Sequence, residues 1–155
     1  MMSVDLFEDF LEQKGLNFEL SVSESSTKTA AQAAKAHGVP VSNIVKSLVV
    51  KADNKFVIVL CPGDKRVDFK ELKEILNKKS VRMAKAEEAK EATGHSIGGI
   101  PPFGHLRPLG TVILEGFDKH EPLWAAAGAS NVNFKIGLEE LKNIVDDINK
   151  SVFSD

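Results

Sequence analysis

Two runs rich in β-branched and apolar residues, 44–51 and 55–60, are separated only by a short polar turn at Asp53 and Asn54. Runs of this kind form strands, and a short polar turn between them is typical of a β-hairpin. Predicted helices interrupt the strands without the regular alternation of a doubly wound parallel sheet. We therefore expect an α+β fold in which a curved mixed β-sheet, barrel-like in shape, forms a core surrounded by helices.

Helical periodicity and capping signals predict where the helices begin and end. Thr29 and Gln32 have the spacing of a capping box, and Asp68 can cap the helix that follows it. The expected helices cover residues 3–15, 29–37, 68–76, 86–93 and 138–152, with Ser3 capping the first and Gly94 ending the fourth. Further strands are expected at residues 16–22, 81–83, 111–114, 124–127 and 132–136.

Length and charge limit the kind of protein. At 155 residues the chain fits one domain, so we expect residues 1–155 to fold as a single unit. The net charge of -2 lacks the positive excess of a protein that coats long nucleic acids. Contact with RNA must then be local, and DNA is not an expected partner. No apolar run approaches the roughly 20 residues that cross a bilayer, and the acidic N-terminus does not resemble a signal peptide, so we expect a cytoplasmic protein without a membrane partner.

The sequence lacks the common catalytic motifs. Its four histidines do not have the spacing of a zinc site, and no phosphate loop, dinucleotide glycine motif or nucleophile elbow is present. We therefore predict neither a metal nor another cofactor. Cys61 is the only cysteine and follows an apolar run. We interpret it as a buried structural thiol, with a thiol nucleophile as the alternative.

Three segments, taken in order, resemble the YbaK/prolyl-tRNA-synthetase-associated editing domain, which occurs free-standing and inserted in bacterial prolyl-tRNA synthetases. They are residues 29–38 leading into the Lys46 strand, residues 62–68 (PGDKRVD), and residues 93–104 with the sequence GGIPPFG at their end. Each segment is a weak signal alone, and their joint order carries the resemblance. It implies the fold of that family and an ester hydrolase that removes wrongly attached amino acids from tRNA.

The resemblance also implies roles for individual residues. Lys46 matches a lysine that contacts the terminal nucleotide of the tRNA, and a solvated strand lysine is the plainer alternative. Gly98, Gly99 and Pro102 belong to a loop that borders the aminoacyl pocket. We predict these three as catalytic residues, because glycines let backbone N–H groups approach and stabilise an oxyanion while prolines hold the loop rigid. A stiff connecting turn is the alternative reading of this loop.

Further residues are predicted to contact the substrate or the tRNA. The substrate-binding candidates are Thr29, His95, Gly128 and Asn133. Asn133 stands where some family members have an acidic residue or a histidine, and His95 where some have a tyrosine, so the amino-acid specificity stays open. Lys65 and Arg66 could supply a local positive patch for the tRNA, with plain surface solvation as the alternative.

The leading functional hypothesis is a trans-editing deacylase that acts on a mischarged aminoacyl-tRNA, with a small amino acid on a proline tRNA as the expected substrate. Such an enzyme needs no metal, because the ester is already activated and the neighbouring ribose hydroxyl can assist the attacking water. One alternative is a non-catalytic module that binds the tRNA end or a synthetase, which is also a candidate partner of the enzyme. A small-molecule binding protein that uses the same pocket is the third hypothesis.

Overall fold

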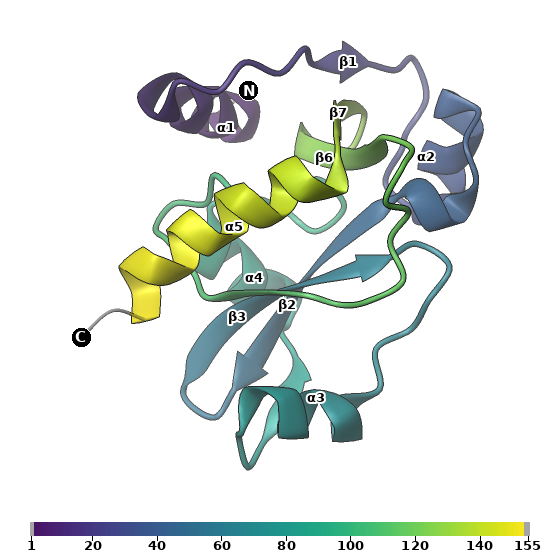
Figure 1. The fold of residues 1–155 in the computed structure, drawn as a ribbon. Helices are drawn as coiled ribbons and strands as arrows, with labels where there is room; N and C mark the ends of the chain where they lie inside the picture. Colours follow the sequence, from purple (N-terminus) through teal and green to yellow (C-terminus); the bar gives the residue numbers. More distant parts are fainter. Residues whose placement is uncertain (1, 154–155) are drawn as a thin grey trace.

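The computed structural model describes residues 2–153 and has the predicted α+β architecture (Figure 1). Its helices are α1 (Met2–Lys14), α2 (Ala30–His37), α3 (Phe69–Leu76), α4 (Ala86–Thr93) and α5 (Leu138–Phe153), with a 3-10 helix at Val41–Asn43. Its strands are β1 (Ser21–Val22), β2 (Val45–Ala52), β3 (Lys55–Pro62), β4 (Val81–Met83), β5 (Thr111–Ile113), β6 (Leu123–Ala129) and β7 (Val132–Ile136). None of the helices in this part of the chain is both long and apolar enough to pass through a membrane.

The strands form two sheets instead of the single barrel-like sheet that we expected. One sheet has the order β4-β2-β3-β5 and the other the order β1-β7-β6. The β3–β5 pair is parallel and the others are antiparallel, so the larger sheet is mixed, as predicted. An isolated bridge between Ile44 and Trp124 joins the two sheets. Because this bridge does not extend into a ladder, no closed barrel forms among residues 2–153.

Local signals in the sequence predicted most helix ends correctly. The Thr29 hydroxyl accepts a hydrogen bond from the Gln32 N–H, and the Gln32 side chain accepts one from the Thr29 N–H, which completes the capping box of α2. The Asp68 carboxylate accepts from two N–H groups at the start of α3. Gly94 ends α4 in a left-handed conformation with φ 79°. These ends fix the positions of α2 and α4, between which the candidate site lies.

Two local predictions were wrong. Ser3 does not cap the first helix, because α1 already begins at Met2 and Ser3 lies within its first turn. The expected strand at residues 16–22 is reduced to the two residues of β1. Leu16, Phe18 and Leu20 instead pack against the core from an extended segment. Their alternation therefore reflects burial on one side and not pairing in a ladder.

Aromatic side chains join the N-terminal helix to the rest of the core. Phe7 of α1, Phe103 of the GGIPPFG loop and Phe134 of β7 are fully buried, and their ring centroids lie 5.0–5.7 Å apart. A separate cluster around Leu72 packs α3 on the other face of the β2–β3 hairpin. Figure 1 accordingly shows α1 and α3 at opposite ends of the molecule, with α5 between them. The aromatic cluster holds the loop that borders the candidate site.

Candidate active site

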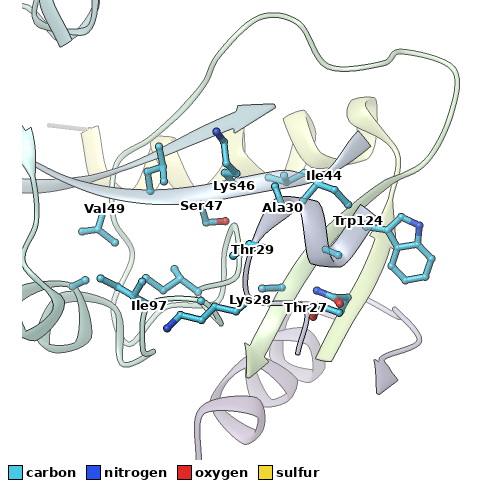
Figure 2. Close-up of a pocket in the computed structure, with 18 of the residues that line it drawn as sticks. Thr27, Lys28, Thr29, Ala30, Ile44, Lys46, Ser47, Val49, Ile97 and Trp124 are labelled. Atoms are coloured by element: carbon cyan, nitrogen blue, oxygen red, sulfur yellow. The ribbon is translucent and has the colours of Figure 1, made fainter. Parts of the chain in front are cut away.

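A cavity of about 440 Å³ opens between the start of α2, strand β2 and the loop that follows α4 (Figure 2). Strands β6 and β7 supply its remaining wall. The wall is mostly apolar and includes the small side chains of Ala30, Ala33, Ala84, Ala89 and Ala126. A cavity of this size, apolar with a few polar groups, is typical of a site for a small ligand.

The structure brings four of the predicted site residues to this one cavity, namely Thr29, Lys46, Gly98 and Asn133. The Thr29 hydroxyl already accepts a hydrogen bond from the Gln32 N–H at the start of α2. Asn133 is buried, and its amide oxygen accepts a hydrogen bond from His37 Nε2 at 3.0 Å. Its amide nitrogen lies 3.4 Å from the Ala125 carbonyl. Asn133 is thus held rigidly in the wall of the cavity.

The Lys46 ammonium does not point into the cavity. It donates a hydrogen bond to the Lys65 carbonyl. Figure 2 shows the Lys46 amine and the Ser47 hydroxyl on opposite sides of β2, as expected for neighbouring strand residues. Lys46 therefore borders the cavity through the part of the residue close to the β2 backbone. Its ammonium can reach a ligand there only if the side chain leaves the Lys65 carbonyl.

Ser47 is a cavity residue that the sequence analysis missed. Its hydroxyl is the only buried side-chain nitrogen or oxygen in residues 2–153 without a hydrogen-bond partner. A buried polar group left unpaired costs about 1–3 kcal/mol, so a ligand that pairs with it gains affinity. The alternation along β2 could have indicated this residue, because only one of Lys46 and Ser47 can face each side of the sheet.

Lys28 is a second residue that the sequence analysis missed. It lines the cavity, and a Cβ atom on Gly98 would lie 2.5 Å from Lys28 Cγ. The lysine stem therefore lies directly against the Gly98 backbone. The one ion pair among residues 2–153 joins Arg82 to Glu88, so no carboxylate in that range neutralises Lys28. Nothing in its sequence context distinguishes Lys28 from a surface lysine.

Gly99 and Pro102, predicted as catalytic residues, do not line the cavity. The Gly99 N–H donates to the Ser96 carbonyl at 3.0 Å, so it is engaged in a turn and not free for an oxyanion. A Cβ atom on Gly99 would lie 2.9 Å from backbone atoms of Ala129. Gly99 is needed because the loop approaches β6 closely, and the buried Pro102 restricts the same loop. Gly98 is the glycine of the pair that faces the cavity.

His95 and Gly128, predicted to bind substrate, also lie outside the cavity lining. His95 is fully buried, and its Nε2 donates to the Gly104 carbonyl at 3.0 Å. Its Nδ1 then accepts from the Ser3 hydroxyl. Burial lowers the pKa of His95, which favours this neutral form. Gly128, with φ 109°, packs against the backbone of Ser3 and Val4. His95 therefore joins α1 to the loop, Gly128 lets α1 lie close to β6, and neither residue lines the cavity.

A second histidine, His105, stabilises the GGIPPFG loop by a hydrogen bond and makes the stability of the fold depend on pH. His105 Nε2 donates to the Pro101 carbonyl at 2.8 Å, and burial lowers the pKa of His105 to about 4. The unfolded chain, with an ordinary histidine pKa of about 6.5, binds the proton first. Stability from this group is therefore complete above pH 6.5 and is lost as the pH falls from 6.5 towards 4.

We expect the free energy of unfolding to fall by on the order of 1–2 kcal/mol between pH 7 and pH 5 because of His105. Urea unfolding at the two pH values measures this change, and a His105→Gln variant should show a smaller dependence on pH. His120→Gln, at an exposed position, is the matched control. Equal pH dependence in wild type and His105→Gln would contradict the assignment.

Lys65 and Arg66 are exposed and lie beside a separate cavity of about 520 Å³ between α3 and strands β3 and β5. The Lys46 ammonium is bound to the Lys65 carbonyl, so three cations gather around this turn. Cys61 is buried nearby, as predicted, and burial raises the pKa of its thiol. A neutral buried thiol is a poor nucleophile. Across residues 2–153, no three His, Cys, Asp or Glu side chains come together in a group that could hold a metal ion.

Comparison with known proteins decides the family. Residues 24–144 match the aminoacyl-tRNA editing domain family. The chain belongs to this family. The match includes all four predicted residues that line the cavity of about 440 Å³, and it confirms the resemblance seen in the sequence.

Individual relatives of this editing domain include both short and long proteins. The protein YwhH of Bacillus subtilis is 30% identical over 119 residues, which cover 76% of this chain and 75% of YwhH. A proline–tRNA ligase of Thermosipho africanus is 43% identical over 79 residues, but these cover only 14% of that ligase and 51% of this chain. The solved structure of a proposed trans-editing enzyme for prolyl-tRNA synthetase superposes with a TM-score of 0.86 at 32% identity, covering 93% of this chain and 92% of the other. The fold of the editing domain is thus shared over nearly its full length.

Proposed function

We propose that this editing domain acts in trans as a deacylase. It hydrolyses the ester between a wrongly attached amino acid and the 3′-terminal ribose of a tRNA, and releases the free amino acid and the tRNA. The observation that carries the proposal is the cavity of about 440 Å³, in which the unpaired Ser47 hydroxyl, Lys28 and the Gly98 backbone lie within a mostly apolar wall. It occurs in a chain whose family edits aminoacyl-tRNA.

The expected substrate is a small amino acid on a proline tRNA. The walls of the cavity come from several elements and bound a limited volume of about 440 Å³, so we propose a steric filter that excludes larger side chains. The similarity to a proline–tRNA ligase and to a proposed trans-editing enzyme for prolyl-tRNA synthetase supports the choice of tRNA. Ser47 offers the hydroxyl that can pair with a polar group of the bound aminoacyl ester.

The proposed mechanism uses positioning and electrostatics and no metal or other cofactor. The ester is already activated, so water assisted by the neighbouring ribose hydroxyl can attack its carbonyl. Gly98 lines the cavity, which supports a role for its backbone N–H in stabilising the oxyanion that forms. Lys46 leaves the Lys65 carbonyl to pair with a phosphate of the terminal nucleotide, while Lys65 and Arg66 attract the acceptor end.

We further propose that residues 1–155 work as one domain in the cytoplasm. The mischarged tRNA is the main partner, and an aminoacyl-tRNA synthetase that produces it is a second candidate. Neither DNA nor a membrane enters the proposal. The similarity to part of a proline–tRNA ligase supports a link to that class of synthetase.

Purified protein incubated with a panel of mischarged tRNAs tests this function. We expect release of a small amino acid from proline tRNA, and a loss of about tenfold or more in kcat/KM for Lys46→Ala, because a hydrogen bond to a charged group contributes about 1.5–3 kcal/mol. Lys142→Ala, on the exposed side of α5, is the matched control and should keep full activity. Binding of tRNA without release of any amino acid would instead favour the non-catalytic module.

A further inference from the structure

Trp124 and His37 form a stacked pair at the edge of the cavity. The indole of Trp124 and the imidazole of His37 lie nearly parallel, with centroids 3.7 Å apart and planes 6° from each other. His37 ends α2, and its Nε2 is bound to Asn133 on β7. Three elements therefore fix the orientation of the two rings, and the pair is rigid before any ligand binds.

A lysine without a carboxylate partner in residues 2–153 lies over the indole of this pair. Lys135 lies directly opposite Trp124 in the β6–β7 ladder, and its Nζ lies over the indole ring, 5.8 Å from the centroid. Lys135 is exposed and forms no ion pair with any residue of 2–153. A base that displaces the ammonium from the ring would find an indole for stacking and a nearby charge for its phosphate, which is the combination that binds single-stranded nucleic acid.

The position of the pair relative to the cavity is equally informative. Trp124 lines the cavity, and Figure 2 shows its indole at the edge of the site, pointing away from Lys28 and Ile97. The indole thus stands at the rim of the space that we propose for the ester. The nucleotides next to the aminoacyl ester in a tRNA are unpaired, so their bases are free to stack on an aromatic ring.

We propose that Trp124, backed by His37 and flanked by Lys135, binds an unpaired base at the 3′ end of the tRNA. This inference rests on the proposed function and deepens it, because it names the part of the tRNA that the edge of the cavity recognises. Stacking tolerates any base, so the surface contributes affinity for an unpaired end and not recognition of a sequence.

The composition of the chain makes tryptophan fluorescence a direct measure of RNA binding at Trp124. Trp124 is the only tryptophan and the chain contains no tyrosine, so the intrinsic fluorescence reports on this one residue. We expect a single-stranded RNA tetranucleotide ending in CCA to quench that fluorescence saturably. Lys135→Ala should weaken the binding several-fold and reduce its dependence on salt, whereas Lys142→Ala should bind like wild type. Absence of quenching at saturating RNA would overturn the proposal.

A second measurement does not depend on the tryptophan signal. Fluorescence anisotropy of labelled RNA should show binding about tenfold or more weaker for Trp124→Leu than for wild type, with Trp124→Phe close to wild type, since stacking is lost only in the first. In deacylation, Trp124→Leu should raise KM with little change in kcat. If Trp124→Leu and Lys135→Ala bind RNA like wild type while deacylation proceeds, the stacking surface is wrong and the proposed function stands. RNA-dependent quenching without any deacylation would support the stacking surface and contradict the proposed deacylase function.

Discussion

Replacing Gly98 by alanine is expected to lower kcat/KM for deacylation by about a hundredfold, because a misplacement of about 1 Å at a reacting centre can have an effect of that size. Gly98 has φ 96°, a conformation that costs a side-chain-bearing residue about 1–3 kcal/mol. The added Cβ atom would also meet the Lys28 side chain at 2.5 Å. The loop and Lys28 must both move, and both line the cavity.

Suitable controls separate this effect from a general sensitivity to alanine. The Cβ atom that alanine would add at Gly137 has no neighbour within 4 Å, and the φ of Gly137 is not positive. Gly137→Ala should therefore keep wild-type activity. Adding Lys28→Ala to the Gly98→Ala variant removes the side-chain contact but leaves the backbone strain. Steady-state deacylation kinetics compare the variants, and urea unfolding shows whether the fold is retained. Full activity of Gly98→Ala would mean that this loop does not contribute to the reaction.

Gly128→Ala is expected to lower the free energy of unfolding by about 3 kcal/mol or more, at the upper end of single substitutions. A Cβ atom at this position would lie 2.7 Å from the Ser3 carbonyl oxygen and 2.9 Å from Val4 Cα, which are backbone atoms that cannot turn aside. The φ of 109° adds strain. Relief of the clash requires α1 to separate from β6, and α1 contributes the fully buried Phe7 to the core.

Gly38→Ala separates the contribution of backbone strain from that of the clash. Gly38 also has a positive φ, 64°, but a Cβ atom there would have no neighbour within 4 Å. We expect a loss of about 1–2 kcal/mol for Gly38→Ala, which is the cost of the left-handed conformation alone. Urea unfolding of wild type and both variants gives the comparison. A Gly128→Ala protein no less stable than Gly38→Ala would show that α1 does not need its contact with β6.

The elements that depend on neighbouring residues could be predicted from the sequence. The capping box at Thr29 and the carboxylate cap at Asp68 each involve residues two or three positions apart, and both fix helix ends where expected. The β2–β3 hairpin follows from its turn and from its β-branched strands. The division into two sheets could not be predicted, because the pairing of β1 with β7 and of β3 with β5 depends on contacts between distant segments.

The same distinction applies to the candidate site. Lys46 and Gly98 could be placed together at one cavity through the family resemblance. The direction of the Lys46 ammonium depends on strand alternation and on the Lys65 carbonyl, and Ser47 consequently faces the ligand side. The role of His95 depends on Ser3, which is 92 positions away in the sequence. Contacts of this range leave no periodic or local signal.

Deacylation of mischarged proline tRNA by an Ala126→Phe variant tests the role of the cavity most directly. Ala126 lines the cavity on β6, so a benzyl group there occupies the space assigned to the aminoacyl ester. Ala86→Phe, at an exposed position at the start of α4, is the matched control. We predict that wild type and Ala86→Phe release the amino acid, and that Ala126→Phe remains folded but does not. Undiminished release by folded Ala126→Phe would contradict the assignment of deacylation to this cavity.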